Sequence, residues 1–159
     1  MKDITNEEKG CAKINLALHV TGIQADGYHA LDSIVVFTDV FDRLFFKRSL
    51  KNVVTLTGEF SGSINVQENS ILQALELFGN GLTDRFSINL EKNLPIGAGL
   101  GGGSADAAAV IRFITNNSKH LMPSYEVLSK IGADIPACVL SVASRVGGIG
   151  EIVRPLDMS

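Results

Sequence analysis

The sequence is poor in several features that define particular classes of protein. It has no tryptophan and two cysteines in 159 residues, and charged residues make up only 19% of the chain. Cys11 and Cys138 lie far apart and form no C-x-x-C pair, so neither a disulfide scaffold nor a zinc site is predicted. A net charge of −3 disfavours nucleic-acid binding through bulk positive charge. With 45% apolar residues, the composition also excludes a disordered tail.

Long apolar runs are absent as well. The nearly apolar stretches 33–37 and 135–143 are much shorter than the roughly 20 residues that a membrane-spanning helix needs. The first ten residues are polar and lack the apolar segment of a secretory signal. We therefore expect a cytoplasmic protein with no membrane partner, in which a lead-in over 1–10 precedes one folded unit over 11–159.

The spacing of apolar residues predicts both strands and helices. Residues 11–20 alternate, which places Lys13 and Asn15 on one face of a strand with Ala17 and His19, and Leu16 and Leu18 on the other. Further strands are predicted at 31–40, 42–46, 53–57, 86–90 and 151–154, and helices at 71–78, 104–117 and 125–131. This mixture of strand runs and helix runs predicts an α+β fold.

The most informative segment is the glycine-rich stretch Pro95–Ser104, PIGAGLGGGS, which lies between a predicted strand and a predicted helix. Glycines allow successive backbone N–H groups to point at an anion without a side chain in the way. The helix that follows would add its own free N–H groups and its dipole. Ser104 is predicted as the N-cap of this helix, with Asp106 in the first turn. The segment therefore predicts a phosphate-binding loop, with a plain surface loop as the alternative.

Two common phosphate-binding motifs fit this loop poorly. Gly97, Gly99 and Gly102 satisfy G-x-G-x-x-G, but the polar residues 116–120 stand where a dinucleotide-binding domain would place its next strand. The Walker A pattern nearly fits from Gly97, but Gly103 occupies the position of the required lysine. The loop is therefore assigned to neither motif.

The segment Pro95–Ala109 closely resembles the ATP-binding motif of the GHMP kinase superfamily. Its Gly-Gly-Gly-Ser extension resembles one branch, the kinases of 4-diphosphocytidyl-2-C-methyl-D-erythritol in the non-mevalonate route to isoprenoids. Four further segments resemble that branch in the same order: Ala12–Leu16, Gly22–His29, Ile131–Pro136 and Gly148–Leu156. The resemblance implies a lobe like ribosomal protein S5, with a mixed or antiparallel sheet packed on helices. It also implies a second lobe outside these 159 residues.

The resemblance also implies roles for particular residues. Lys13 and Asp134 would be catalytic, with Asp134 as the base that accepts the proton of the acceptor hydroxyl. Asn15, Tyr28 and His29 would contact the substrate, and Ser104 would be a candidate ligand of Mg²⁺. ATP would be bound by Asn69, Lys92, Pro95, Ile96, Gly97, Ala98, Gly99, Leu100, Gly101, Gly102, Gly103, Ser104 and Ala105.

The function implied by the resemblance is ATP- and Mg²⁺-dependent phosphorylation of the 2-hydroxyl of a cytidine-diphosphate-linked methylerythritol. Two alternatives remain at this point. The chain could bind nucleotide with little turnover, or it could be a non-enzymatic domain that associates with another copy through the surface facing the second lobe.

Overall fold

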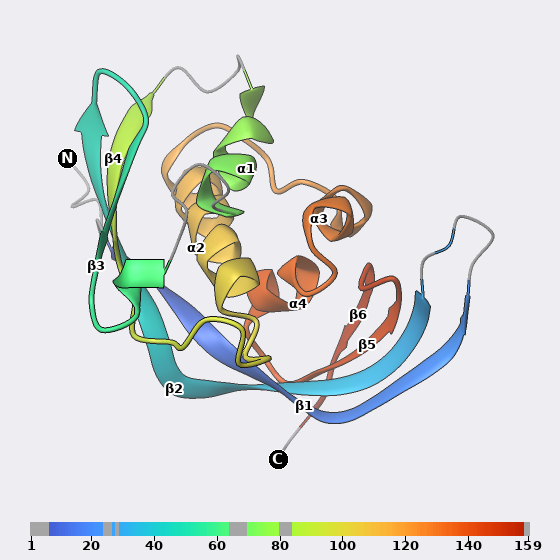
Figure 1. Cartoon of the computed structure of the whole chain (residues 1–159). Helices are drawn as coiled ribbons and strands as arrows, with labels where there is room; N and C mark the ends of the chain where they lie inside the picture. Colours follow the sequence, from blue (N-terminus) through green and yellow to red (C-terminus); the bar gives the residue numbers. More distant parts are fainter. Residues whose placement is uncertain (1–6, 24–26, 28, 64–69, 80–83, 158–159) are drawn as a thin grey trace.

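A computed structural model describes residues 7–23, 27, 29–63, 70–79 and 84–157. The described strands form one curved sheet with the helices inside its curve (Figure 1). The strands are β1 (Glu7–Ile23), β2 (His29–Ser49), β3 (Val53–Thr57), β4 (Arg85–Glu91), β5 (Ser144–Gly148) and β6 (Ile152–Pro155). The helices are the short 3₁₀ helix η1 (Ser61–Ser63), α1 (Ser70–Glu76), α2 (Gly102–Asn117), α3 (Tyr125–Ile131) and α4 (Ile135–Leu140).

Strand β2 organises the sheet. Strand β1 pairs antiparallel with one edge of β2, while β4 and β5 pair antiparallel with different parts of the other edge. Strand β3 pairs in parallel with β4, and β6 pairs antiparallel with β5. Both orientations therefore occur in one sheet, and the predicted α+β class with a mixed sheet is confirmed.

Helix α2 lies at the centre of the hydrophobic core. It packs against β1, β2, α1 and α4, which explains why nearly all of Ala105–Ile114 is buried rather than one stripe. Phe113 of α2 stacks on Phe46 of β2 at 3.8 Å between ring centroids, and Phe86 of β4 meets both rings edge-on. The centre of α2 is thereby fixed against the sheet, and with it the start of the helix after the glycine loop.

Strand β1 departs from the predicted alternation at Leu16. Asn15 and Ala17 pair with adjacent residues of β2, so Leu16 is an extra residue and forms a β-bulge. A one-residue insertion exchanges the two faces of a strand. Leu18 therefore shares the face of Lys13 and Asn15, and the predicted grouping of Ala17 with those two residues is wrong.

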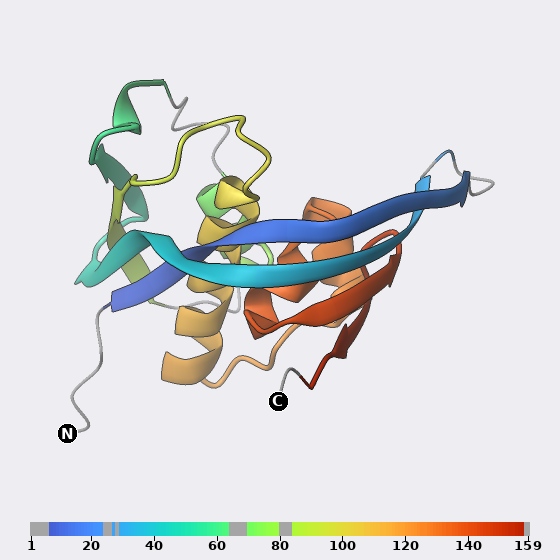
Figure 2. The same cartoon turned by 90° about the horizontal axis from the view of Figure 1, so that it is seen from below.

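The β1–β2 hairpin is also longer than predicted. The two predicted strands 31–40 and 42–46 are one continuous strand, β2, and β1 continues to Ile23. Figure 2 shows the far part of this hairpin projecting beyond the helices. On β1, Leu16, Leu18 and Val20 are more than half exposed, at 61%, 53% and 60%.

The start of α2 differs from its prediction. The helix begins at Gly102, and its N-cap is Gly101 in the left-handed conformation with φ 66°, so Ser104 is not the N-cap. Glycine adopts this conformation without the steric cost of a side chain. Asp106 consequently lies beyond the first turn, and it is buried.

Two elements near the C-terminal end of the chain, one helix and one strand, were not predicted from the sequence. Residues 135–140 form α4, although their run of apolar residues has no amphipathic pattern. A helix that is covered on all sides lacks the polar face that periodicity detects. Residues 144–148 form β5, although Gly147 and Gly148 suggested a loop. Both glycines lie in the strand because β2 and β6 pair with it on its two sides.

Candidate active site

The glycine loop runs from the end of β4 into α2 and is open to solvent along its first half. Gly97, Gly99 and Gly101 have positive φ angles of 74°, 75° and 66°, a region that L side chains rarely adopt. A side-chain carbon at Gly97 or Gly99 would meet nothing within 4 Å, so the backbone there is accessible. Ala105 is the first residue of α2 whose N–H bonds back to Gly101, which leaves the preceding N–H groups of the helix without intrahelical partners. This arrangement suits an anion.

Lys13 lies directly beneath this loop. Its backbone N–H donates to the carbonyl of Leu100 at 2.8 Å, which attaches β1 to the loop. Its side chain is 2% exposed, and Nζ lies 3.3 Å from Asp134 Oδ1. A side-chain carbon at Gly101 would lie 3.3 Å from Lys13 Cε and 3.6 Å from Asp134 Oδ2. The structure therefore brings Lys13, Asp134 and the loop together.

Asp134 stands at the N-terminus of α4. Its side chain does not cap that helix, and it is 42% exposed, so its carboxylate is available both to Lys13 and to a ligand. Two residues earlier, a side-chain carbon at Gly132 would lie 3.4 Å from Ser104 Oγ. The segment before α4 thus lies close to both β1 and the start of α2. These three parts of the chain are distant from one another in sequence.

Asn15 is held next to Lys13 by a residue that sequence reasoning missed. Its Oδ1 accepts hydrogen bonds from Lys13 Nζ and from Ser33 Oγ, each at 3.0 Å. Ser33 is buried on β2 and also lies 2.8 Å from the carbonyl of Ala17. No local signal in the sequence identifies Ser33, because its role depends on the pairing of β2 with the bulged part of β1.

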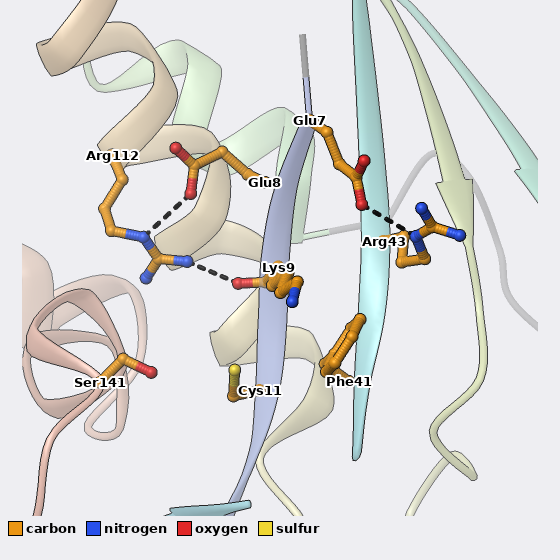
Figure 3. A pocket seen from close by; sticks show the side chains of 8 residues that line it. All are labelled: Glu7, Glu8, Lys9, Cys11, Phe41, Arg43, Arg112 and Ser141. Atoms are coloured by element: carbon orange, nitrogen blue, oxygen red, sulfur yellow. Dashed lines mark hydrogen bonds and ion pairs between the residues drawn. The ribbon is translucent and has the colours of Figure 1, made fainter. Parts of the chain in front are cut away.

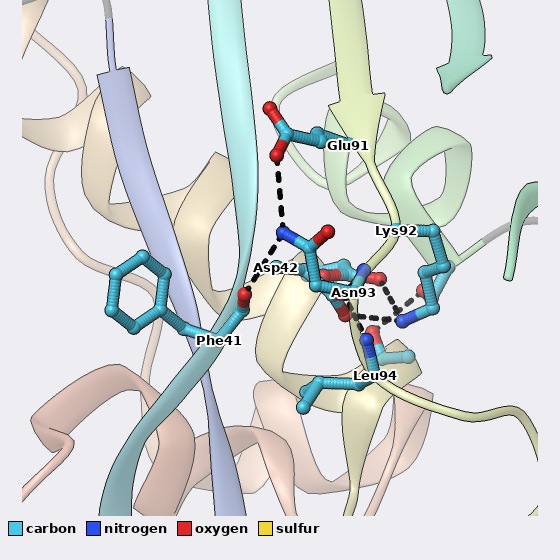
Figure 4. Close-up of polar contacts among 9 residues, drawn as sticks. Phe41, Asp42, Glu91, Lys92, Asn93 and Leu94 are labelled. Atoms are coloured by element: carbon cyan, nitrogen blue, oxygen red, sulfur yellow. Dashed lines mark hydrogen bonds and ion pairs between the residues drawn. The ribbon is translucent and has the colours of Figure 1, made fainter. Parts of the chain in front are cut away.

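The ammonium of Lys92 does not reach the open side of the loop. It is 3% exposed and enclosed by the carboxylates of Asp42 and Asp106, below Gly102 (Figure 4). This placement departs from the expected direct contact between Lys92 and ATP. Sequence reasoning also missed Asp42, whose place in the cluster arises from the pairing of β2 with β4.

The residues expected to contact the far end of the substrate lie apart from Lys13. His29 is exposed at the start of β2, eight residues before Phe37, the partner of Lys13 in the β1–β2 register. Eight residues of strand correspond to a path of about 26 Å. Tyr28 and Asn69 lie outside the described residues.

A separate hollow of about 880 Å³ lies against the first part of β1 (Figure 3). Two ion pairs cross it, Arg43 with Glu7 at 2.9 Å and Arg112 with Glu8 at 3.2 Å. Both guanidinium groups are already occupied by carboxylates. None of the predicted site residues lines this hollow, whose lining residues are Glu7, Glu8, Lys9, Cys11, Phe41, Arg43, Arg112 and Ser141.

Metal ligands are sparse around the loop. Across the residues that the structure describes, no group of three or more His, Cys, Asp and Glu side chains could hold a metal ion. Mg²⁺ differs from most metals in being bound commonly by one or two protein oxygens together with substrate phosphates. The hydroxyl of Ser104, which lies in the first turn of α2 and close to Gly132, fits that mode.

In the same described part of the chain, no helix is long and apolar enough to cross a membrane.

The fold and the site together define an α+β domain whose glycine-rich loop opens a helix above a lysine–aspartate pair. Comparison with known proteins agrees with this class. The family described as "GHMP kinases N terminal domain" matches residues 69–149. The chain belongs to the GHMP kinase family, a family of small-molecule kinases, and corresponds to its N-terminal domain.

Two curated relatives and one solved structure share one name. The chain is 44% identical over 157 residues to a 4-diphosphocytidyl-2-C-methyl-D-erythritol kinase of Rhizobium johnstonii, and 42% identical over 146 residues to one of Cereibacter sphaeroides. These alignments cover 94% and 91% of the chain, but the chain spans only about half of each relative, 52% and 51%. A crystal structure of 4-(cytidine 5'-diphospho)-2C-methyl-D-erythritol kinase matches with a TM-score of 0.76 and 32% identity, over 96% of the chain and 56% of that protein.

Proposed function

We propose that this chain is the ATP-binding lobe of a kinase that phosphorylates the 2-hydroxyl of 4-diphosphocytidyl-2-C-methyl-D-erythritol. The observation that carries the proposal is the 3.3 Å contact between Lys13 and Asp134 directly beneath Gly101 of the glycine loop. A phosphate-binding loop next to a carboxylate and an ammonium contains the groups that transfer of a phosphoryl group to an alcohol requires.

The choice of substrate rests on the relatives and on the site. Both curated relatives and the solved structure are named for the cytidyl substrate, and the similarity to them extends over more than nine tenths of the chain. The chain would contact such a substrate through Asn15 beside Lys13 and through His29 at the far end of the hairpin, with Tyr28 as a further contact implied by the family. A contact region of this length suits a long molecule with a nucleotide at one end and a polyol at the other.

The reaction proceeds by in-line transfer in this proposal. The acceptor hydroxyl oxygen forms a bond to the γ-phosphorus of ATP while the bond from that phosphorus to the β–γ bridging oxygen breaks. The electron pair leaves with ADP, and the hydroxyl proton passes to the carboxylate of Asp134. The ammonium of Lys13 stabilises the charge that develops on the acceptor oxygen.

The phosphates are held by the backbone N–H groups of 97–104 and by the N-terminus of α2. The hydroxyl of Ser104 would hold Mg²⁺ together with the phosphate oxygens, and the metal would neutralise charge on the transferred group.

The test is an assay of the 159-residue chain with Mg·ATP and the diphosphocytidyl substrate, in which ADP release is followed. Asp134→Asn should lower turnover by about 10²–10⁴-fold because it removes the base. It should leave the Kd for Mg·ATP nearly unchanged, because the loop is intact. Calorimetric titration with Mg·ATP measures that Kd.

The alternatives give different results. If the wild type binds Mg·ATP but releases no ADP, the chain is a nucleotide-binding module that requires a further lobe for turnover. If neither calorimetry nor thermal melting detects Mg·ATP, the loop does not bind nucleotide and the proposal is wrong. Turnover that is unchanged in Asp134→Asn removes Asp134 from the chemistry.

A further inference from the structure

A buried charged cluster lies beneath the glycine loop. It consists of Lys92, Asp42 and Asp106, whose exposed fractions are 3%, 0% and 2% (Figure 4). Lys92 Nζ donates to Asp42 Oδ2 and, at 3.0 Å, to Asp106 Oδ2. Among the described residues, Asp106 Oδ1 has no hydrogen-bond partner.

The cluster joins the segments that border the loop. Asp42 belongs to β2, and its Oδ1 accepts the backbone N–H groups of Asn93 and Leu94 at 2.6 and 2.8 Å, just where the chain enters the loop. Asp106 belongs to α2, where the chain leaves the loop. Lys92 connects the two carboxylates, so both ends of the loop are attached to one ammonium.

The loop itself rests on this ammonium. A side-chain carbon at Gly102 would lie 2.9 Å from Lys92 Nζ, so only glycine allows the backbone to come this close without displacing the lysine. Gly10 of β1 is similarly close to the other carboxylate, because a side-chain carbon there would lie 2.7 Å from Asp106 Oδ1. The two glycines let the backbone of the loop and of β1 pack directly on the cluster.

Stability alone does not account for such a cluster. Burying charges costs solvation, and apolar replacements of buried ion pairs are often as stable or more stable. In some proteins, buried charged groups fix a particular geometry instead.

We propose that Asp42, Lys92 and Asp106 are positioning residues that hold the glycine loop in its anion-binding conformation from below, without touching the bound phosphates. The inference rests on the proposed function as far as the anion is ATP. The conformation of the loop, however, is open to measurement without any nucleotide.

The experiment compares the wild type with Asp106→Ala, which removes one acceptor of Lys92, and with Asp106→Asn, which keeps an oxygen in its place. Phe86→Leu is the control, because Phe86 lies in the core at the opposite end of β4 from the loop. Two quantities are measured for each protein. One is amide hydrogen exchange in the ligand-free chain at Asn93, Leu94 and Ala105, whose N–H groups are hydrogen-bonded to Asp42 or to the carbonyl of Gly101, and the other is the Kd for Mg·ATP.

We expect Asp106→Ala to accelerate exchange at Asn93, Leu94 and Ala105 and to raise the Kd by about tenfold or more, since small displacements of a site have effects of that size. Asp106→Asn should restore both quantities to within about threefold of the wild type. Phe86→Leu should lower the melting temperature without a selective change at the loop.

A second variant covers the outcome in which Asp106→Ala does not fold. Lys92→Met combined with Asp106→Leu removes the ammonium and one carboxylate together, and such replacements often preserve stability. The proposal expects a folded protein with faster exchange at Asn93, Leu94 and Ala105. A folded double variant with unchanged exchange overturns the proposal. An equal acceleration of exchange at the loop in the control Phe86→Leu also overturns it. If the wild type fails to bind Mg·ATP, the proposed function fails, and the exchange data still decide the role of the cluster.

Discussion

Hydrogen bonds from neighbouring side chains orient single residues in the site. The Oδ1 atom of Asn15 accepts from Lys13 Nζ and Ser33 Oγ, so its Nδ2 points away from both. Asn15 is exposed, and its amide nitrogen is therefore the group that it offers to a ligand. An amide nitrogen donates hydrogen bonds only. The substrate atom that contacts Asn15 is accordingly expected to be an acceptor, such as a hydroxyl or phosphate oxygen.

Ser33→Ala tests this orientation. The variant loses one of the two donors to Asn15 Oδ1, a change of about 1 kcal/mol. We expect the Kd for the diphosphocytidyl substrate to rise by about fivefold, while the Kd for Mg·ATP stays the same. Calorimetry measures both, and Ser33→Thr, which keeps the hydroxyl, serves as the control. An equal increase in both constants would point to a general disturbance of the fold instead.

The titration of Asp106 predicts a pH dependence of stability. Its pKa is raised from 3.8 to about 8, chiefly by burial. Between these values the folded state keeps a proton that the unfolded state releases, so stability is highest at low pH and declines as pH rises. The slope is at most about 1.4 kcal/mol per pH unit for one proton.

Urea unfolding at several pH values between 5 and 9, about one unit apart, measures this decline in the wild type. Asp106→Asn cannot titrate and should show a flatter dependence, so the free energies of unfolding of the two proteins should diverge as pH increases. Parallel curves for the two proteins would show that Asp106 does not exchange its proton on unfolding in this range.

At the scale of elements, a close contact between two loops positions α4. A side-chain carbon at Gly150, just before β6, would collide with the backbone carbonyl of Ala133, and Gly150 also has a φ of 111°. Ala133 immediately precedes Asp134. The chain between β5 and β6 therefore determines where the carboxylate of Asp134, the proposed base, can lie.

Gly150→Ala should consequently lower both stability and activity. The added methyl group displaces residues 133–134, and a shift of about 1 Å in a reacting group can reduce turnover by about 10²-fold. Thermal melting and the ADP-release assay measure the two effects. Gly62→Ala is the matched control, because a side-chain carbon at Gly62 meets nothing within 4 Å. Equal behaviour of the two variants would contradict the positioning role of Gly150.

At the scale of the whole molecule, strand β1 of the β1–β2 hairpin presents apolar side chains to solvent. Leu16, Leu18, Val20 and Ile23 are between 53% and 70% exposed. Apolar surface of this kind favours association. We expect the mass of the chain in solution to increase with concentration, as measured by analytical ultracentrifugation.

Replacing Leu16 and Leu18 together by serine should reduce that increase. Leu121→Ser is a suitable control, because Leu121 is 88% exposed and lies outside the hairpin. Association that is equal in all three proteins would exclude the hairpin as the contact surface. A mass that does not change with concentration in the wild type would show that the exposed side chains do not drive association.

The amino-acid sequence by itself determined the features that depend on neighbouring residues. The alternation in β1 up to Asn15, the apolar spacing of α2 and the glycines of 95–104 are local patterns, because backbone geometry repeats every two or 3.6 residues. The sequence also carried the family resemblance, which the comparisons confirmed.

Only the tertiary structure decided the features that depend on partners distant in sequence. The bulge at Leu16 follows from the register with β2, and the enclosure of Lys92 follows from two carboxylates that lie 50 and 14 residues away in the chain. A lysine that is buried between two aspartates has the same local sequence as one in solvent. The difference arises from packing, which sets the solvation of the charge and the geometry of its contacts.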